Sequence, residues 1–401
     1  MTGSEVASGS APVETGLTAI AERLADGDAD ALVVVGDRFD SDLRYLSRAG
    51  TFDGRAAIAV SEDDAVLCPP AVERFDSSVS PVESRFRRGR ATNPIDRSVR
   101  PVDTDDGAPV GERAAAAVTE LVGSGADVVV PRTLPHDAAV YLKQAGHSIA
   151  STTAVREART TKSDAEIDRL RTVQTAATAA MGDVAAIVAE STVASDASGS
   201  LCWREEPLSA ERLRREADAA LARAGVDPAG NTMVEGSQAD RNVLRAGDPI
   251  VVSIAPRGPV GYHGALTRTF VVDGDGGWER RAHVAGETAG EMAVDAADPG
   301  VRVAVVSEEI SAEVGAYGFD PAPGESGSGA VAVVHGVGLD RREPPSVDGE
   351  TELRAGTVLA VEAGVRDREN GSIRLRDLMV VRESGGERIG ECPSALAPER
   401  Y

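Results

Sequence analysis

Lysine is almost absent from this 401-residue sequence, cysteine and aromatic residues are scarce, and long apolar runs are missing. Only Lys143 and Lys162 are lysines among the 42 basic residues, and 65 acidic residues bring the net charge to −23. A chain this negative is a poor general binder of nucleic acid or of an anionic membrane surface. We therefore expect neither as a partner.

The replacement of lysine by arginine on an acidic surface indicates a protein adapted to high salt, in which salt screens the self-repulsion of the charges. A GC-rich genome that favours arginine codons is the alternative. It explains the arginines but leaves the excess of acidic residues unexplained.

Three cysteines, Cys68, Cys202 and Cys392, are far apart and show no C-x-x-C spacing. Their number is odd, which favours unpaired thiols in a reducing compartment over a disulfide framework or a metal site. No uninterrupted run of about 18 apolar residues occurs, and the N-terminus lacks a basic stretch followed by an apolar one. We expect no membrane span and a cytoplasmic location.

Hydrophobic residues make up 42% of the sequence, which is enough for a sizeable core. After a Ser/Gly/Ala/Glu tail at 1–14, which we expect to be disordered, a helical pattern at 17–24 is followed by short apolar runs at 31–35, 56–60 and 126–131. This alternation predicts an N-terminal α/β domain over 15–152. The basic stretch SRFRRGR at 84–90 is interpreted as a solvated loop rather than a phosphate-binding patch, because one Phe does not make a stacking platform.

A second domain is predicted over 155–401. The tetrad SDAE, from Ser163 to Glu166, has the spacing of a helix-starting capping box, and apolar residues follow it at helical spacing. Further helices are expected at 209–224, 279–297 and 302–315. From 249 onward strands dominate: two in VVSIAPRGPVGYHGALTRTF (251–270), joined by a turn, then 330–334, 357–365 and 372–381. Helices and mainly antiparallel strands segregated in this way indicate an α+β domain.

Four segments in order resemble a known family: REARTTKSDAEIDRLR at 156–171, GYHGALTRTF at 261–270, HGVGLDRREPP at 335–345 and VLAVEAGVRDRENGSIRLRDLMVV at 358–381. The series is similar to the proline-peptidase branch of the pita-bread superfamily, which includes Xaa-Pro aminopeptidases, prolidases and the metal-free creatinases. The resemblance implies an N-terminal creatinase-like domain, a C-terminal pita-bread domain and a homodimer.

The resemblance also implies where two divalent ions, Mn, Co or Zn, would be held in relatives: two Asp, one His and two Glu. Carried over one position at a time, the five places are Ser253, Ala265, His335, Glu362 and Arg376. The Pro-His step usual upstream is missing from EGSQADRNVLRAGD (235–248). The family's second His is replaced by Arg342, although Glu343 and Pro345 follow it as in the family.

These substitutions are incompatible with two metal ions. The five positions supply one negative charge, at Glu362, and one positive charge, at Arg376. Two dications about 3.5 Å apart repel by roughly 19 kcal/mol at an effective dielectric constant of about 20, and bridging carboxylates normally offset this. We therefore expect no cofactor, and instead a bidentate Arg376–Glu362 ion pair where relatives hold metal.

The remaining candidate catalytic and binding residues could also have ordinary structural roles. His335 is either a hydrogen-bonded structural residue or a catalytic base, and His263, expected on the strand beside Tyr262, is a substitute base. Glu362 completes the catalytic candidates. The expected binding residues are Tyr262, Arg268, Arg342, Glu343 and Arg376. For Arg268 the alternative is stabilisation of the hairpin, and for Glu343 it is capping of a turn.

Three functions remain open from the sequence. The first is a peptidase fold without peptidase chemistry, kept for binding a peptide or small molecule or for regulation. The second is a metal-free C–N hydrolase of the creatinase type, although the histidine that resembles creatinase's base is missing. The third, which the missing ligands disfavour, is an active Xaa-Pro metallopeptidase.

Overall fold

The computed structural model describes residues 17–48, 53–70, 86, 95–100, 107–195, 199–236, 242–322, 327–347 and 350–401. The chain forms two compact units, Met1–Arg159 and Thr160–Tyr401. The sequence analysis placed this division between 152 and 155, and helix α6 (Ala154–Ala158) occupies the segment just beyond. The tail at 1–14 and all of 84–90 except Phe86 lie outside the described residues.

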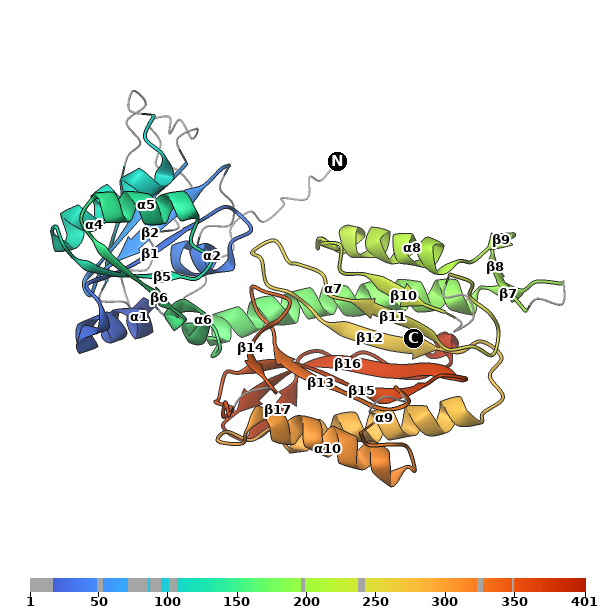
Figure 1. Ribbon diagram of the computed structural model, residues 1–401. Coiled ribbons are helices and arrows are strands. Elements are labelled where there is room, and N and C mark those ends of the chain that lie inside the picture. Colours follow the sequence, from blue (N-terminus) through green and yellow to red (C-terminus); the bar gives the residue numbers. More distant parts are fainter. Residues whose placement is uncertain are drawn as a thin grey trace, which may run out of the picture. The chain divides into compact units, whose positions relative to one another are not determined.

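The first unit is built on a six-stranded sheet in the order β4-β3-β2-β1-β5-β6 (Figure 1). Its elements are α1 (Leu17–Arg23), the π-helix η1 (Leu24–Asp28), β1 (Ala31–Gly36), α2 (Ser41–Ser47), β2 (Ala56–Val60), β3 (Asp64–Cys68), β4 (Asp96–Val99), α4 (Val110–Val122), β5 (Asp127–Pro131), α5 (His136–Gln144), β6 (Ser148–Thr152) and α6. Strands β1 and β2 are buried along their whole length, as short continuous apolar runs predict. The sheet is mixed, because β2 runs antiparallel to both β1 and β3 whereas β5 is parallel to β1 and β6.

The second unit holds an eight-stranded sheet in the order β10-β11-β12-β16-β15-β13-β14, with β17 paired to β16. Its helices are α7 (Asp164–Ala189), α8 (Ala210–Arg223), α9 (Trp278–Asp295), α10 (Val303–Ala316) and the 3-10 turn η3 (Pro398–Arg400). The strands of the sheet are β10 (Met233–Glu235), β11 (Ile250–Ile254), β12 (Leu266–Phe270), β13 (Gly329–Gly336), β14 (Glu343–Ser346), β15 (Val358–Asp367), β16 (Gly371–Arg382) and β17 (Gly385–Arg388). A small separate sheet joins β7 (Thr192–Val193), β8 (Leu201–Trp203) and β9 (Glu206–Pro207).

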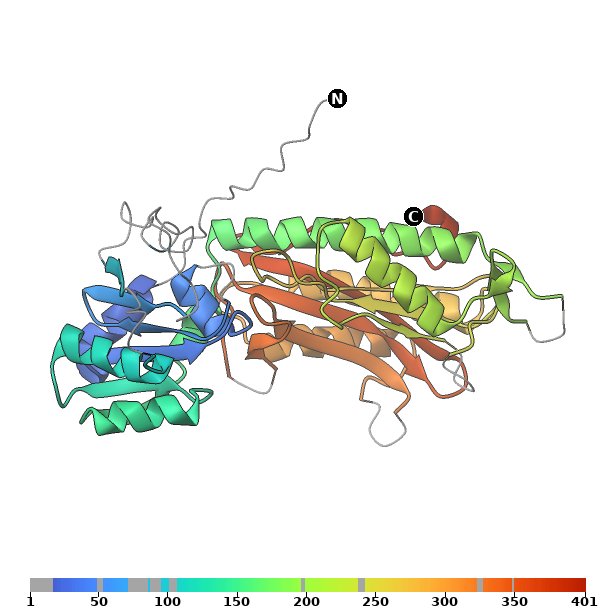
Figure 2. The ribbon, with the colours of Figure 1, turned by 90° about the horizontal axis from the view of Figure 1, so that it is seen from above.

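One face of the eight-stranded sheet is covered by helices. Side chains alternate between the faces along a strand, and the alternate residues of β11, β12, β15 and β16 that face the helices are mainly apolar, interrupted by Arg268 of β12 and Asp377 of β16. Helices α7 and α8 pack together over β11 and β12, and α9 and α10 lie side by side over β13, β15 and β16 (Figures 1 and 2). The alternate residues, among them Glu362 and Arg376, face the other side and form the polar face of the sheet.

Helix α7 begins as the sequence predicts. The Ser163 hydroxyl accepts from the Glu166 amide at 3.3 Å, and the Glu166 carboxylate accepts from the Ser163 amide at 2.9 Å. With 26 residues and a mean hydropathy of 1.2 in its most apolar window, α7 is long and apolar enough to cross a membrane by length and composition alone. Its apolar stripe, from Leu170 to Val188, is buried against the sheet and α8, so α7 is a core helix.

The two strands expected in 251–270 are present, but the connection between them is longer than a turn. Strand β11 ends at Ile254 and β12 starts at Leu266, so that Tyr262, His263 and Ala265 belong to the connecting loop. The prediction that His263 lies on a strand is therefore wrong: Pro256 and the close approach of Gly258 and Gly264 to Val173 of α7 turn the chain away from the sheet.

Gly364 of β15 offers a sharp test of this packing. A Cβ atom added there would lie 2.0 Å from the Ile373 carbonyl oxygen of β16, which is backbone and has little freedom to move. We expect Gly364→Ala to lower the free energy of unfolding by about 1–3 kcal/mol or more. The matched control is Gly182→Ala within α7, where the added atom meets nothing within 4 Å and better helix propensity should add about 0.5–1 kcal/mol. Denaturant titration of both variants measures the difference; equal stabilities would contradict this packing.

Candidate functional site

A row of polar residues crosses the polar face of the sheet from one strand to the next. Ser253 on β11 is paired in register with Thr267 on β12, Thr267 with Arg376 on β16, and Arg376 with Glu362 on β15. Residues paired in this way across antiparallel strands point to the same side. The Thr267 hydroxyl donates to the Ser253 hydroxyl oxygen at 2.9 Å, which fixes both side chains within the row.

Glu362 is the centre of the row and is 2% exposed. Arg376 Nη2 contacts Oε2 of Glu362, and Arg374 Nη1 lies 3.4 Å from Oε1. The predicted ion pair of Arg376 with Glu362 is thus present, but its expected bidentate form is wrong, because each carboxylate oxygen meets a different arginine. Arg374 reaches the same carboxylate since residues two apart on a strand share a face.

The two guanidinium groups have donors left over. Arg374 Nη2 lies 3.5 Å from Oε1 of Glu235 on β10, an ion-pair distance without hydrogen-bond alignment. Nε of Arg374 and Nε of Arg376 are also buried without a hydrogen-bond partner among the described residues. Buried donors of a charged group normally have partners, so these N–H groups are unusual for buried arginines.

His335 stands at the end of β13, in register with Ala360, and therefore on the same face as Glu362. Its Nδ1 lies 3.0 Å from the Gly336 carbonyl oxygen and donates to it, since an imidazole N–H is the only donor of the two groups. Burial lowers the pKa of His335 to about 4, and the charges of Arg342 and Arg376 act in the same direction. The imidazole is therefore neutral at pH 7.

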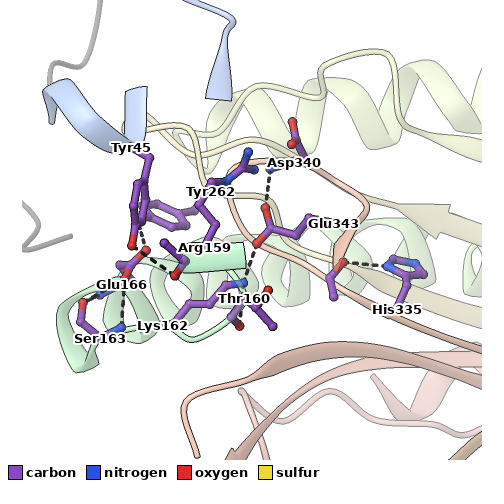
Figure 3. Close-up of polar contacts among 12 residues, drawn as sticks. Tyr45, Arg159, Thr160, Lys162, Ser163, Glu166, Tyr262, His335, Asp340 and Glu343 are labelled. Atoms are coloured by element: carbon purple, nitrogen blue, oxygen red, sulfur yellow. Dashed lines mark hydrogen bonds and ion pairs between the residues drawn. The ribbon is translucent and has the colours of Figure 1, made fainter. Parts of the chain in front are cut away.

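Two residues expected near this row have other partners. The Tyr262 hydroxyl donates to Oε1 of Glu166 at 2.9 Å, which ties the loop before β12 to the first turn of α7 (Figure 3). His263 is buried in the same loop, its amide donating to the Gly338 carbonyl at 2.8 Å and its Nδ1 3.5 Å from the Ala255 carbonyl. Burial lowers the pKa of His263, so it too is neutral at pH 7.

Arg268, expected among the binding residues, lies on the opposite face of the sheet from Thr267 and Arg376. Its guanidinium donates to Asp377 at 2.6 Å and to the Pro393 and Cys392 carbonyls at 2.6 and 3.0 Å. These contacts fix the C-terminal segment against β12 and β16. Side chains alternate along a strand, so Arg268 in the sequence T-R-T points away from the face that carries Thr267 and Thr269. This placement favours stabilisation of the hairpin over ligand binding as the role of Arg268.

Glu343, the second residue whose role was left open, is part of a buried ion pair. Lys162 Nζ lies 2.5 Å from Glu343 Oε1, and the two side chains are 1% and 2% exposed (Figure 3). A Cβ atom at Gly338 would lie 2.2 Å from the same Oε1, so glycine is needed there to admit the carboxylate. Glu343 therefore anchors the segment that follows His335 through Lys162, and it also caps the turn there, because its Oε2 accepts from the Asp340 amide at 3.4 Å. The sequence analysis missed its partner Lys162.

The residues at the five family positions do not fit a pair of metal ions. Ala265 has no donor side chain, and its amide and carbonyl are both hydrogen-bonded to the Gln174 side chain at 3.1 Å. Ser253 is engaged by Thr267, and both Glu362 oxygens face arginines. Only His335 remains as a ready donor. Within the described parts of the chain, no three His, Cys, Asp or Glu residues converge as metal ligands would.

Residues 168–383 match the sequence profile of metallopeptidase family M24. Among characterised relatives, the Xaa-Pro dipeptidase of Pyrococcus horikoshii is 27% identical over 161 residues, 40% of this chain and 44% of that protein. The probable dipeptidase PepE of Mycobacterium tuberculosis is 26% identical over 254 residues, 62% of this chain and 63% of the relative. The chain thus matches less than two thirds of the length of these relatives.

Solved structures share the fold over nearly the whole chain. The Xaa-Pro dipeptidase from Bacillus anthracis superposes with a TM-score of 0.75 at 17% identity, covering 95% of this chain and 98% of that one. The prolidase from Pyrococcus horikoshii gives 0.70 at 18%, covering 95% and 99%. The N-terminal domain of the FACT complex subunit SPT16 from Cicer arietinum gives 0.66 at 15%, covering 96% of each chain.

The Lys162–Glu343 pair provides a stability test. Lys162→Met leaves a buried carboxylate without its counter-charge, and we expect a loss of about 3–5 kcal/mol in the free energy of unfolding. Adding Glu343→Gln should recover part of that loss, because no charge is then buried unpaired. The control is Arg223→Gln, which removes an exposed pair with Asp183 at 3.1 Å and should change stability by less than about 1 kcal/mol. Losses that simply add in the double variant would contradict the pairing.

The pKa of His335 gives a pH prediction. Because this pKa is lowered to about 4 in the folded protein from an ordinary value of about 6.5, the stability it contributes is present above about pH 6.5. It is lost as the pH falls through about 4, with a slope of at most roughly 1.4 kcal/mol per pH unit. NMR titration of the imidazole protons, with His335→Gln to assign the signal, measures the pKa. A value near 6.5 would show that His335 is not buried as described.

Proposed function

This chain belongs to metallopeptidase family M24, and we propose that it is a member whose dimetal centre is lost and whose pita-bread domain binds a ligand instead of cleaving a peptide bond. The observation that carries the proposal is the contact of both Glu362 oxygens with arginines, Arg374 and Arg376, from the neighbouring strand. A metal ion at Glu362 would have to displace a guanidinium and then accept two cationic neighbours.

The donor set supports the same conclusion. A catalytic zinc ion is normally held by three protein ligands, whereas the five family positions here provide one neutral imidazole and one carboxylate that is already paired. The fold itself does not demand peptidase chemistry, since one of its structural neighbours is described as a subunit of the FACT complex. The similarity to Xaa-Pro dipeptidases therefore gives this chain their architecture, and we propose that it does not extend to their reaction.

A metal-free C–N hydrolase is the second candidate. The observation in its favour is His335, which is neutral at pH 7, lies on the same face of the sheet as Glu362, and has Nε2 left after Nδ1 bonds to Gly336. Such an imidazole can accept a proton. Against it stands the state of the other polar groups in the row: the Glu362 carboxylate is paired with two arginines, and Ser253 and Thr267 bond to one another.

The proposal includes the setting expected from composition and family: a cytoplasmic homodimer adapted to high salt, which takes a peptide or small molecule rather than nucleic acid or a membrane. The net charge of −23 supports both exclusions. Assays therefore belong in molar salt, where the charge repulsion is screened.

Metal content and peptidase activity test the proposal together. Purified protein incubated with Mn²⁺, Co²⁺ or Zn²⁺ in molar salt and then desalted should retain well under one ion per chain by elemental analysis. It should show no hydrolysis of Xaa-Pro dipeptides. Two retained ions per chain, or metal-dependent hydrolysis, would establish the active peptidase instead.

A variant that restores the ligands provides the positive control. Ser253→Asp, Ala265→Asp and Arg376→Glu together rebuild the five-residue set, and we expect this triple variant to retain Mn²⁺ where the parent protein does not. The metal-free hydrolase is tested with guanidino and amide substrates in the absence of metal. Turnover that disappears in His335→Gln would favour it over the binding role.

A further inference from the structure

We propose that Arg374 and Arg376 on the polar face of the sheet, together with Arg341 and Arg342 of the loop between β13 and β14, form an arginine cluster that binds the oxyanion group of a small ligand, a carboxylate or a phosphate. The inference rests on the proposed function, because the anion would occupy the place that relatives of this family use for metal ions. It inverts the sign of the ligand: a site built for cations in those proteins takes an anion here.

Unused donors are the first reason. Arg374 is only 9% exposed, yet within the part of the chain that the structure describes its Nε and Nη2 have no hydrogen-bond partner, and neither has Nε of Arg376. A buried guanidinium N–H without a partner is costly, and carboxylate and phosphate oxygens are the acceptors that match the planar fork of arginine. Nη1 of Arg374 donates to Oε1 of Glu362 at 3.4 Å, and Nη2 of Arg376 contacts Oε2 of Glu362; neither contact involves these three N–H groups.

Charge is the second reason. Among the described residues, Glu362 contacts Arg374 and Arg376, and Glu235 contacts Arg374, so two carboxylates balance these two arginines. The exposed Arg341 and Arg342 add positive charge beside this balanced group. Burial lowers the pKa of Arg376; Glu362 opposes this, while Arg374 and Arg341 lower it further. Arg342 in turn lowers the pKa of His335. In a chain of net charge −23, four arginines beside two carboxylates favour an anion over a cation as the ligand.

Access is the third reason. The side chain of Arg376 is 19% exposed and that of Glu235 is 24% exposed, and Arg341 and Arg342 are exposed. Solvent therefore reaches Arg376, Glu235, Arg341 and Arg342, whereas Arg374 and Glu362 are buried. The neutral His335, the Ser253 hydroxyl and the Thr267 hydroxyl line the same face and offer further polar contacts without adding negative charge.

Calorimetric titration of metal-depleted protein at constant ionic strength tests the inference, with inorganic phosphate and succinate as separate probes and chloride as the background anion. We expect saturable binding of at least one probe, and the probe that binds tells phosphate from carboxylate. Arg374→Gln should weaken that binding about tenfold or more, as loss of a charged hydrogen bond does. Arg342→Gln should weaken it by a smaller factor, because Arg342 is exposed and acts by charge.

Two controls keep the outcome clear. Arg223→Gln removes an equally charged but exposed arginine from α8, far along the fold from β16, and should bind the probe as the parent protein does. Arg342→Gln changes an exposed side chain, so it remains informative if Arg374→Gln does not fold. Failure of both probes to bind, or equal binding by the parent and Arg342→Gln proteins, overturns the anion site. Retained metal in the parent protein would instead overturn the proposed function, so the two failures are told apart.

Discussion

The burial of one carboxylate governs the polar face of this sheet. Glu362 lies in β15 with strands on both sides and almost no contact with solvent, and a charge in such a position must be compensated nearby. In this chain the compensation comes from two guanidiniums of the adjacent strand. These two guanidiniums determine the charge along the whole row, because arginine remains charged at every physiological pH and repels any metal ion that approaches.

The fold could be predicted from the sequence to a large extent because its signals are local. Short apolar runs gave β1, β2 and β5, and the capping box placed the start of α7 within a residue. The strands β13, β15 and β16 and the helices α9 and α10 also lie where alternation and helical periodicity indicate. The connection between β11 and β12 was misjudged, since a loop held to α7 by close glycine contacts has no periodicity to reveal it.

The site was less predictable, for a reason that differs from residue to residue. The ion pair of Arg376 with Glu362 was foreseen, but Arg374 was overlooked although R-L-R on a strand puts both arginines on one face. The T-R-T of β12 carries the same signal, and with it Arg268 could have been assigned to the opposite face. The pairing of Glu343 with Lys162 joins residues 181 positions apart, and nothing in the local pattern of either segment indicates it.

Lys162 shows what a depleted residue type can reveal. Forty of the 42 basic positions in this chain are arginine, so whatever pressure removed lysine has acted nearly everywhere. Lys162 is one of the two exceptions: its ammonium group lies 2.5 Å from Oε1 of the buried Glu343, and a Cβ atom added at Gly338 would lie 3.0 Å from its Cε. The planar guanidinium of arginine is bulkier than an ammonium group, so this crowded and buried position favours lysine. The other lysine, Lys143, is exposed on α5, and it is therefore the buried exception that points to a site where shape outweighs composition.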